Sequence, residues 1–538
     1  MRAPHPWEAL YPPDVDWNTP IERGTIPALL DRAVSRFADA PAIEFRGRRL
    51  SFSELGTRVE RFAAGLLGLG LHPGDAVGLY LPNTPWHPIA FFGVLRAGMR
   101  VVHLSPLDPP RALARKLADS GAATVVTTNV ARLLPAAMRL LEDGDISRLV
   151  VGRDAEWGGG EALEFPHGID ANDVVGPPPH EWPKLTPDDI ALLQYTGGTT
   201  GHPRAAMLTH GNLTAAVSII DAWQPPDRNL RPGDRVIGVL PLFHIYALTA
   251  VLLRSLHRGA EVMLRQRFDP AATLDDIETG RATVFPGVPT MWIALAATPG
   301  LDTRDLSSLR SSTSGGAPLP VEMSDRFHRL TGLRLGGGWG MTETSPVGAN
   351  LLPERPFRSG EIGVPLPGIT MRVVALDDPA RVVARDEVGE IAIKGPNVTP
   401  GYWKRPEENA RAFADGFFLT GDVGSMDETG YFTLVDRKKD MIISGGFNVY
   451  PRIIEEAIYE HPDVAEAAVI GIAHAYRGQA AKAFVALRPG AAELTLGDLR
   501  AFLEERLGRH EIPTELELRD SLPKTPVGKL SRHALATE

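Results

Sequence analysis

The sequence predicts a large α/β protein that carries a second, smaller α+β domain. Over the first two hundred residues, short β-rich runs alternate with amphipathic helical stretches, which is typical of α/β folds with largely parallel sheets. From about residue 360, short strands separated by turn residues indicate a β-rich subdomain. After residue 436, helix and strand patterns alternate again. We therefore expect an N-terminal domain at residues 1–436 and a C-terminal domain at residues 437–538.

Local patterns predict the elements in order. The first cycle is a strand, an amphipathic helix and a strand, and the second cycle adds two strands with helices between them. These elements are expected at residues 75–82, 86–98, 101–106, 123–127 and 148–152. Residues 157–187 are rich in Gly, Pro and acids and show no period, so we predict a surface excursion there.

The later part of the chain is predicted in the same way. Its β-rich stretch contains three strand-like runs, MRVVALDD, GEIAIKG and GYFTLVDR, at residues 371–378, 389–395 and 430–437. The final stretch begins with a helical pattern, PRIIEEAIYEHP. Two strand patterns, AEAAVIGIA and KAFVALRP, follow it.

Composition excludes several classes of protein. With 538 residues, 43% of them hydrophobic, the chain has ample material for the cores of several domains. The formal net charge of −10 provides no global basic field for nucleic acid, so any phosphate site must be local. The absence of cysteine excludes disulfides, thiolate metal sites and a cysteine nucleophile.

No targeting or membrane-spanning segment is predicted. The N-terminal run MRAPHPWEALYPPDVDW carries prolines and acids where a signal peptide needs an apolar core, which indicates a cytoplasmic protein. The most apolar stretch, residues 236–253, barely reaches the length of a membrane span and is interrupted by Pro241, His244 and Tyr246. We interpret it as a buried strand, a turn and a buried helix, and peripheral membrane contact stays open.

The strongest local signal is a Gly/Thr cluster in YTGGTTGHPRAAMLTH, residues 195–210. QYT ends one predicted strand and AAML begins another, so residues 196–201 form the loop between them. Glycines allow several backbone N–H groups to converge, the threonines add hydroxyl donors, and Arg204 supplies charge, as a polyphosphate site requires. An ordinary hairpin turn needs only two to five residues and no threonine pair. The Walker phosphate loop and the GxGxxG dinucleotide motif are both absent from the sequence.

Further clusters suit other parts of a nucleotide. In LGGGWGMTETSP, residues 335–346, glycines beside Trp339 let a planar ring lie against backbone, and Thr342 with Glu343 offers a hydroxyl and a carboxylate for phosphate and Mg²⁺. Asp422, in TGDVG, can accept two ribose hydroxyl hydrogen bonds, although such an aspartate more often stabilises its own turn. Lys529 stands in a Pro/Gly-bounded loop near the C-terminus, where most lysines are simply solvated.

Taken together, these segments closely resemble the signature series of the adenylate-forming superfamily. The matching segments are YTGGTTGHPR, SGGAPLP, WGMTETSP, TGDVG, DRKKDMIISGGFNVYP and LPKTPVGK, and they span nearly the whole chain. Within the superfamily, the sequence is most similar to medium- to long-chain fatty-acid and dicarboxylic-acid CoA ligases. The resemblance implies a large N-terminal domain of two α/β subdomains and a β-barrel-like one, joined by a hinge to a mobile C-terminal domain.

The resemblance also implies the reaction and its residues. A carboxylic acid would react with ATP and Mg²⁺ to give an acyl-adenylate and pyrophosphate, and coenzyme A would then take the acyl group and release AMP. The implied catalytic residues are Lys529, Glu343 and Thr342, with Glu343 binding the metal. The implied ATP/AMP-binding residues are Thr196, Gly197, Gly198, Thr199, Thr200, Gly201, Arg204, Gly316, Ala317, Pro318, Gly338, Trp339, Gly340, Thr342, Asp422 and Arg437. The implied acyl-pocket residues are His244, Gly315 and Gly337, the hinge is Lys439, and the CoA tunnel is lined by Gly445, Gly446 and Phe447.

Three residues depart from the family pattern, and one of them is Ala205, which stands where glycine is usual. Arg204 stands where a lysine is usual, which preserves charge but changes geometry. Trp339 stands where tyrosine or phenylalanine is more common, so a nucleotide base should still stack there in a narrower pocket.

Some alternatives stay open at the level of sequence. An acyl- or aryl-AMP ligase, or a stand-alone adenylation enzyme serving a carrier protein, would use the same first step without CoA. A light-emitting oxygenase is a further alternative, because its chemistry is closely related. A non-catalytic binding protein of the same fold would be expected to have lost residues of the active site. Four such residues are all present in this sequence: Lys529, Glu343, Asp422 and Arg437. The identity and chain length of the acid, and whether the protein is a homodimer, are not determined by these motifs.

Overall fold

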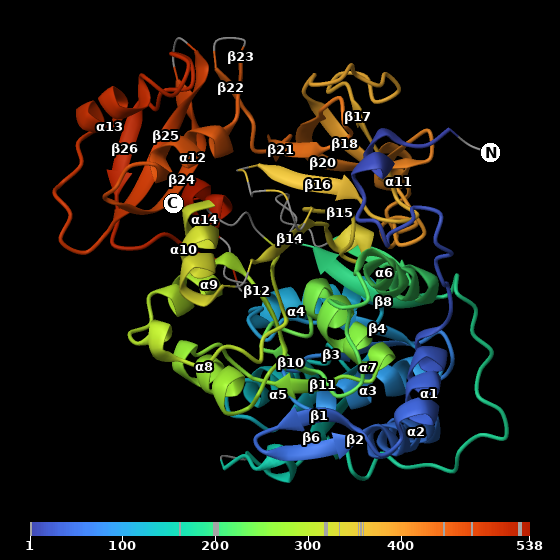
Figure 1. Cartoon of the computed structure of the whole chain (residues 1–538). Helices are drawn as coiled ribbons and strands as arrows, with labels where there is room; N and C mark the ends of the chain where they lie inside the picture. The colour runs from blue at the N-terminus through green and yellow to red at the C-terminus, as the bar shows by residue number, and fades with distance from the viewer. Residues whose placement is uncertain are drawn as a thin grey trace.

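The structure is a computed structural model with two large β-sheets, helices packed on them, and a small third sheet near the C-terminus (Figure 1). The described residues are 3–160, 163–196, 204–316, 321–332, 334–352, 355, 358, 360–444, 447–474, 477–525 and 530–537. The architecture confirms the predicted α/β class with a β-rich unit and a further α+β unit.

The first large sheet has the order β7-β6-β5-β3-β4-β8-β9, and only the β8–β9 pair is antiparallel. Parallel strands are buried on both faces, which explains why they read as continuous runs such as TVVTT rather than as alternating patterns. The strands are β3 (Ala76–Leu79), β4 (Arg100–His103), β5 (Thr124–Thr128), β6 (Arg148–Gly152), β7 (Ile169–Asp170), β8 (Ile190–Thr196) and β9 (Arg204–Thr209). Strands β8 and β9 confirm the predicted pair that flanks the Gly/Thr cluster.

The second large sheet changes character along its length. Its order is β17-β18-β20-β21-β16-β15-β14-β13-β12-β10-β11-β1-β2; the pairs from β14 to β1 are parallel, and those from β14 to β17 are antiparallel. The antiparallel part is the β-rich unit that the sequence predicts. The strands are β1 (Pro41–Phe45), β2 (Arg48–Ser51), β10 (Arg235–Gly238), β11 (Glu261–Leu264), β12 (Val284–Gly287), β13 (Ser311–Ser314), β14 (Gly336–Trp339), β15 (Ala349–Asn350), β16 (Glu361–Pro365), β17 (Thr370–Val374), β18 (Gly389–Lys394), β19 (Phe413–Ala414, paired with β20), β20 (Phe417–Met426) and β21 (Phe432–Arg437).

Helices cover both large sheets, and their starts follow sequence signals. Helix α2 begins at a capping box formed by Ser51 and Glu54, and α6 begins at Thr209, whose hydroxyl accepts from the Asn212 N–H. The helices of this part are α1 (Ile26–Phe37), α2 (Phe52–Gly68), α3 (Trp86–Arg96), α4 (Pro110–Ser120), α5 (Leu134–Glu142), α6 (His210–Trp223), α7 (Arg254–Arg258), α8 (Pro270–Glu278), α9 (Pro289–Ala296), α10 (Val321–Thr331) and α11 (Pro406–Ala412). Helix α3 is buried apart from Arg96, so it is not the amphipathic helix that was predicted there; its apolar residues lie on all sides.

The most apolar stretch folds as predicted in outline. Strand β10 is followed by a turn and by a buried helix at Ala247–Leu253, which has π-type hydrogen bonding and continues directly into α7. In the part of the chain that the structure describes, every helix is too short or too polar to cross a membrane.

The predicted surface excursion at residues 157–187 is only partly a surface segment. It contributes strand β7 to the first sheet, and Trp157, Phe165 and Val174 are buried. Val174 lies on α2 at Gly65, where an added Cβ would sit 2.3 Å from the Val174 carbonyl carbon and oxygen. The absence of a side chain at Gly65 therefore lets an irregular segment pack closely on a helix, which composition alone did not reveal.

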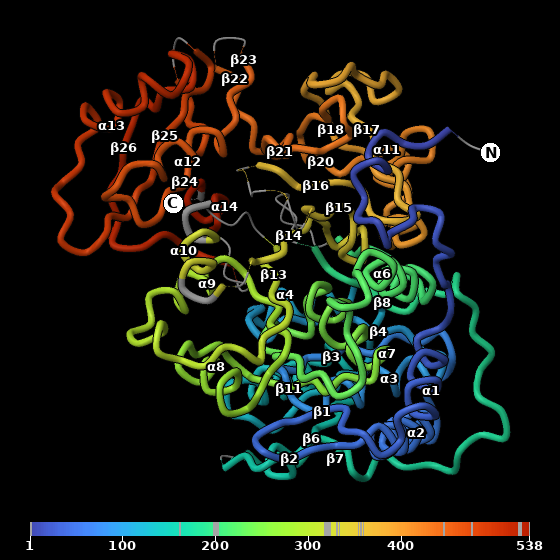
Figure 2. Tube along the Cα trace, in the orientation of Figure 1, coloured from blue at the N-terminus to red at the C-terminus, as the bar shows by residue number. Residues whose placement is uncertain are grey.

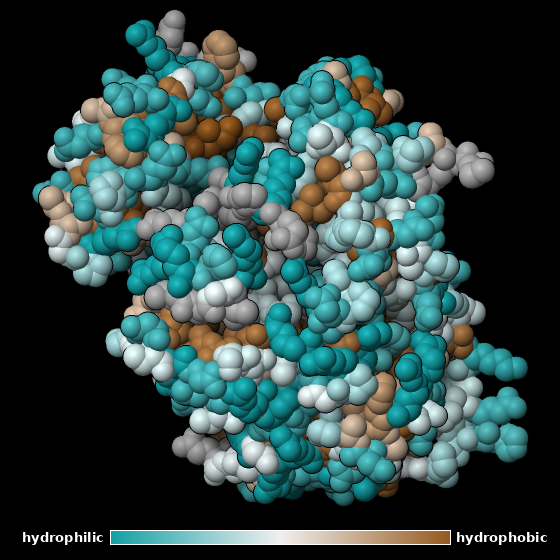
Figure 3. Space-filling model, viewed as in Figure 1, coloured by the Kyte–Doolittle hydropathy of each residue, from teal (hydrophilic) through white to brown (hydrophobic). Residues whose placement is uncertain are grey.

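The C-terminal unit has its own sheet and its own core. Its sheet has the order β23-β22-β25-β24, with β26 beside β25, and Ile454, Val469 and Leu499 are among its core residues. The elements are β22 (Ile442–Ser444), β23 (Phe447–Val449), α12 (Pro451–Tyr459), β24 (Val464–His474), β25 (Gly478–Leu487), α13 (Leu496–Leu503), β26 (Glu515–Leu518) and α14 (Arg532–Thr537). The trace in Figure 2 shows this unit beside the β-rich unit, and Figure 3 shows apolar side chains on its flank toward the β-rich unit.

Candidate active site

Several sequence-predicted residues of the described part end strands near the place where the two large sheets and the C-terminal unit adjoin. Thr196 ends β8, Trp339 ends β14, and Asp422 and Arg437 face each other on β20 and β21. These strands converge near the centre of the molecule (Figure 2). The site is thus assembled from segments more than two hundred residues apart in the chain.

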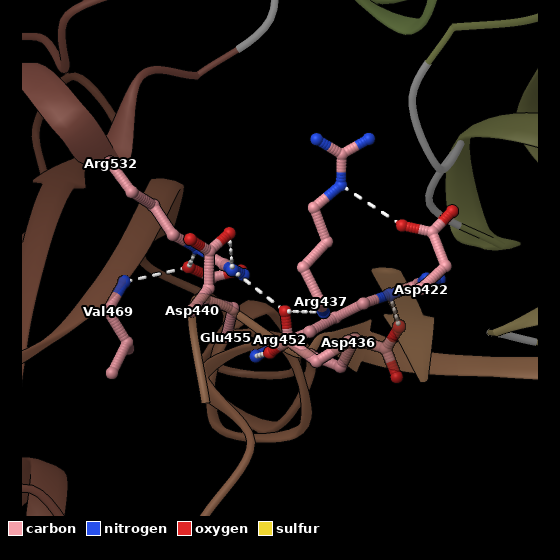
Figure 4. A network of polar contacts seen from close by, with 9 residues as sticks. Asp422, Asp436, Arg437, Asp440, Arg452, Glu455, Val469 and Arg532 are labelled. Atoms are coloured by element: carbon pink, nitrogen blue, oxygen red, sulfur yellow. Dashed lines mark hydrogen bonds and ion pairs between the residues drawn. The ribbon is translucent and has the colours of Figure 1, made fainter. Parts of the chain in front are cut away.

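Asp422 is held by two partners from different strands. Trp339 Nε1 donates a 2.8 Å hydrogen bond to Asp422 Oδ2, and Arg437 Nε lies 3.1 Å from Asp422 Oδ1. The latter pair is seen in Figure 4. Asp422 is only 3% exposed, whereas the Arg437 side chain is half-exposed. The pairing fixes the carboxylate, while the open guanidinium can still meet a ligand.

The indole of Trp339 packs against backbone, as the neighbouring glycines allow. An added Cβ at Gly348 would lie 2.6 Å from the Trp339 ring. The ring is 8% exposed, and its N–H is directed at Asp422. Trp339 therefore orients the predicted ribose-binding carboxylate, a relationship that the predicted base-stacking role did not include.

Glu343 lies in a second polar cluster. It belongs to the short 3₁₀ turn Thr342–Thr344, is 4% exposed, and accepts a 2.7 Å hydrogen bond at Oε1 from the Tyr402 hydroxyl. The guanidinium of Arg204 lies 4.9 Å from the centre of the Tyr402 ring and pairs with Glu408 at 3.2 Å. Arg204, in the place of the usual lysine, is thus engaged by a ring and a carboxylate at once.

Burial and hydrogen bonding shift the pKa of Glu343 in opposite directions. Burial raises the pKa of its carboxyl, while the Tyr402 hydroxyl and the positive charges of Arg204 and Arg437 oppose that rise. The pKa of Tyr402 is raised by burial and by the adjacent carboxylate. The hydroxyl therefore stays protonated and remains a donor to Glu343.

The donor set fits a magnesium ion that arrives with a phosphate ligand. Among the described residues no cluster of three His, Cys, Asp or Glu side chains could hold a metal by itself. Magnesium is usually bound by one or two carboxylates together with substrate phosphates. Glu343 supplies one such carboxylate, with only Oε1 engaged by Tyr402.

Two of the three predicted acyl-pocket residues, His244 and Gly315, lie against Tyr246, and the third, Gly337, lies against Leu351. An added Cβ at Gly315 would sit 2.9 Å from the Tyr246 ring, and the Tyr246 hydroxyl lies 3.2 Å from Thr313 Oγ1. His244 Nδ1 accepts from the Tyr246 N–H at 3.3 Å. At Gly337 an added Cβ would sit 2.7 Å from Leu351 Cδ1. Tyr246 and Leu351 are therefore neighbours of the predicted acyl-pocket residues that the motifs did not indicate.

The hinge and tunnel residues are less closely grouped. Burial lowers the pKa of Lys439, and Arg437 and Arg204 add to that effect while Asp440 opposes it. Phe447 is 59% exposed on β23 and contacts the His510 ring, with the centroids 4.9 Å apart. The β22–β23 hairpin lies at the outer end of the C-terminal unit in Figure 1, so Phe447 is not brought to Asp422 in this arrangement.

Several predicted residues lie outside the described part of the chain. Gly316, Gly338, Gly340 and Thr342 are described beside the residues above. The predicted residues that lie outside are Gly197, Gly198, Thr199, Thr200, Gly201, Ala317, Pro318, Gly445, Gly446 and Lys529.

Family comparisons agree with this arrangement. Residues 30–403 match the family described as AMP-binding enzyme, and residues 453–529 match its C-terminal domain. The chain belongs to this family of adenylate-forming enzymes. One relative, the long-chain-fatty-acid–CoA ligase of Bacillus subtilis, is 38% identical over 100% of this chain and 99% of its own length. The feruloyl-CoA synthase of an Amycolatopsis species is 38% identical over 91% of this chain and 94% of its own length.

Solved structures show the same fold. ATP-bound MatB from Rhodopseudomonas palustris is 29% identical and superimposes with a TM-score of 0.82, covering 95% of this chain and 98% of MatB. The apo form of MatB, with the same coverage, gives a TM-score of 0.75. The present chain is thus more similar in overall arrangement to the ATP-bound form.

Proposed function

We propose that this chain is an AMP-forming acyl-CoA synthetase, an acid–thiol ligase that uses ATP to activate a carboxylic acid and transfers the acyl group to coenzyme A. Curated relatives that match the full length are named as CoA ligases. These names favour coenzyme A over a carrier protein as the acceptor.

The first half-reaction joins the acid to the α-phosphate of ATP. A carboxylate is a poor acyl donor because oxide is a poor leaving group. Attack of the carboxylate oxygen on the α-phosphorus forms the mixed anhydride and expels pyrophosphate. Negative charge gathers where the anions meet, so Lys529 would neutralise the α-phosphate and the carboxylate, and Glu343 would hold the magnesium that accompanies ATP.

The nucleotide itself would be held by the residues around Asp422. Asp422 would accept from the ribose hydroxyls, with Arg437 beside it and Trp339 fixing its orientation. The loop after β8, with Thr196 at its start and Arg204 at its end, would hold the departing phosphates. The buried Asp422, held by both Trp339 and Arg437, is the observation that carries this proposal.

The second half-reaction transfers the acyl group. The thiol of coenzyme A attacks the carbonyl carbon, the bond to the phosphate oxygen breaks, and AMP leaves. Rotation about Lys439 would withdraw Lys529 and bring Phe447, with Gly445 and Gly446, to the path of the thiol. The outer position of the β22–β23 hairpin is consistent with an arrangement for the first half-reaction.

The acid is proposed to be a medium- to long-chain fatty or dicarboxylic acid. The long-chain-fatty-acid ligases among the relatives support this class, while the feruloyl-CoA synthase makes an aromatic acid the second candidate. A panel of acids of varied length and ring content, scored by CoA-dependent AMP formation, separates the two. The cytoplasmic location and a homodimer stay predictions.

The experiment that tests the function compares the two half-reactions. Wild-type protein should exchange labelled pyrophosphate into ATP when given magnesium and its acid. Lys529→Ala should abolish this exchange and largely spare thioester formation from supplied acyl-adenylate. Lys439→Pro should retain exchange and lose thioester formation. Absence of exchange with every acid, or equal loss of both steps in Lys529→Ala, would contradict the proposal.

A further inference from the structure

Arg532 is the centre of a buried ionic network that no motif indicated. Its guanidinium contacts three carboxylates: Asp436 Oδ1 at 2.9 Å, Asp440 Oδ2 at 3.5 Å and Glu455 Oε2 at 2.5 Å (Figure 4). The Arg532 side chain is 22% exposed and Asp436 is 3% exposed. Charges this far from water are retained only when they are paired in good geometry.

The three carboxylates belong to different parts of the chain. Glu455 lies on α12 of the C-terminal unit, where it also accepts from the Val469 N–H at 2.7 Å. Asp436 lies on β21, the strand whose next residue, Arg437, reaches Asp422. Asp440 follows the predicted hinge, Lys439. Arg532 thus joins the C-terminal unit to the strand that carries the ribose-binding pair.

The segment just before Arg532 is anchored at both of its ends. Lys524 and Leu530 form an antiparallel bridge, and the Ser531 N–H donates to the Pro523 carbonyl at 2.8 Å. Lys524 also pairs with Glu466 of β24 at 2.5 Å. Lys529 precedes Arg532 by three positions in the sequence.

The Arg532–Asp436 contact belongs to one orientation of the C-terminal unit. Asp436 precedes Lys439, whereas Arg532 and Glu455 both follow it. A rotation about Lys439 would keep the Arg532–Glu455 pair and separate Arg532 from Asp436. The Arg452 N–H, which donates to Asp436 Oδ2 at 2.7 Å, would be separated in the same way.

We propose that Arg532 is a positioning residue that locks the C-terminal unit in the orientation for adenylation, by joining Glu455 of α12 to Asp436 at the end of β21. The inference rests on the proposed function. An arginine suits the task because its planar group offers five donors in a fixed fork, whereas the three donors of a lysine ammonium rotate on a flexible stem and do not fix the direction of a partner.

The first test measures the two half-reactions separately. Arg532→Lys should lower kcat for pyrophosphate exchange about tenfold or more, because small misplacement of a catalytic group is costly, while KM for ATP changes less than about threefold. Thioester formation from supplied acyl-adenylate should stay within about twofold. Asp436→Asn should act similarly, and the double variant should be no worse than Arg532→Lys.

The matched control is Arg506→Gln. Arg506 pairs with Glu460 at 2.9 Å in the same unit and contacts neither the hinge nor Arg532. Both half-reactions should be unchanged in this variant. If Arg532→Lys lowers both half-reactions equally together with the melting temperature, its role is structural and the proposal is overturned.

The second test measures the orientation of the C-terminal unit from a distance between two spin labels and needs no activity assay. The chain has no cysteine, so one spin label can be placed at Ala271→Cys on α8 and another at Arg500→Cys on α13, both exposed positions. The label-to-label distance reports the orientation of the C-terminal unit. In the presence of ATP, Arg532→Lys should lower the ratio of the main orientation to the rotated orientation about threefold. An unchanged distribution would overturn the proposal. An enzyme inactive toward every acid but showing this shift would contradict only the proposed function.

Discussion

The hydroxyl of Tyr402 donates to Oε1 of Glu343 over 2.7 Å, across 59 positions of sequence. Both groups are buried, and the Glu343 backbone carbonyl accepts a further bond from the Thr399 N–H at 2.7 Å. The segment at residues 399–402 therefore holds the predicted metal-binding carboxylate in place, and its Tyr402 hydroxyl favours the ionised form of that carboxylate.

Tyr402→Phe should weaken magnesium-dependent adenylation. Without the hydroxyl, the pKa of Glu343 rises further, because burial then acts with less opposition. Ionised Glu343 is lost as pH falls through its pKa, so the acidic limb of the pH–rate profile should shift to higher pH. We expect kcat near neutral pH to fall about tenfold or more, since a hydrogen bond to a charged group contributes about 1.5–3 kcal/mol.

The control for this variant is Tyr459→Phe. The Tyr459 hydroxyl donates to the Ala467 carbonyl at 3.4 Å within the C-terminal unit. Its pH profile should match that of the wild type. An acidic limb in Tyr402→Phe that coincides with that of the wild type would show that the hydroxyl does not govern Glu343.

Trp339→Phe should raise KM for ATP. The phenyl ring can still lie on Gly348, but the 2.8 Å hydrogen bond to Asp422 is lost, and the carboxylate is free to rotate away from the ribose. We expect KM for ATP to increase about fivefold or more, with KM for the acid unchanged. Trp157→Phe is the control, because the Trp157 N–H has no hydrogen-bond partner among the described residues. Equal KM values for ATP in the two variants would refute the orienting role.

The sequence predicted most of the architecture because its strands carry local signals. Parallel strands buried on both faces appear as continuous runs of β-branched residues such as TVVTT, and turn residues separate the antiparallel strands after residue 360. The Gly/Thr cluster was correctly placed between two strands, since β8 and β9 end and begin as QYT and AAML predict.

The contacts within the site could not be predicted in the same way. Trp339 reaches Asp422 only because β14, β15, β16, β21 and β20 are consecutive neighbours in one sheet. That order depends on tertiary packing, as do the Tyr402–Glu343 pair and the three carboxylates around Arg532. The motifs therefore indicated which residues matter, but not the residues that hold them in place.

Gly315→Ala should reduce the use of bulky acids. The new methyl would lie 2.9 Å from the Tyr246 ring, closer than ordinary contacts, so the ring would have to shift and strain its hydroxyl contact with Thr313. We expect KM for the acid to rise about tenfold, more for bulky acids than for short ones, with KM for ATP unchanged. Gly24→Ala is the control, because an added Cβ there meets nothing within 4 Å. A uniform change for all acids would place Gly315 outside the acyl pocket.

Two buried histidines should make the protein less stable in acid. His87 and His103 lie with their ring centroids 5.2 Å apart, and neither nitrogen of His87 has a partner among the described residues. Burial lowers the pKa of His103 to about 4 and that of His87 well below its usual value. The unfolded chain therefore binds protons that the native chain excludes, and stability falls as pH drops from about 6.5 to about 4.

His87→Phe removes one of these groups and should reduce the acid sensitivity. Between about pH 7.5 and 5.5, each neutral buried histidine lowers the free energy of unfolding by about 1 kcal/mol. Urea titrations at both pH values, followed by tryptophan fluorescence, should show a loss smaller by that amount in His87→Phe. The exposed His72 provides the control, since His72→Gln should retain the wild-type difference. If the two variants lose stability equally on acidification, His87 takes up its proton in the native state and the buried neutral form is excluded.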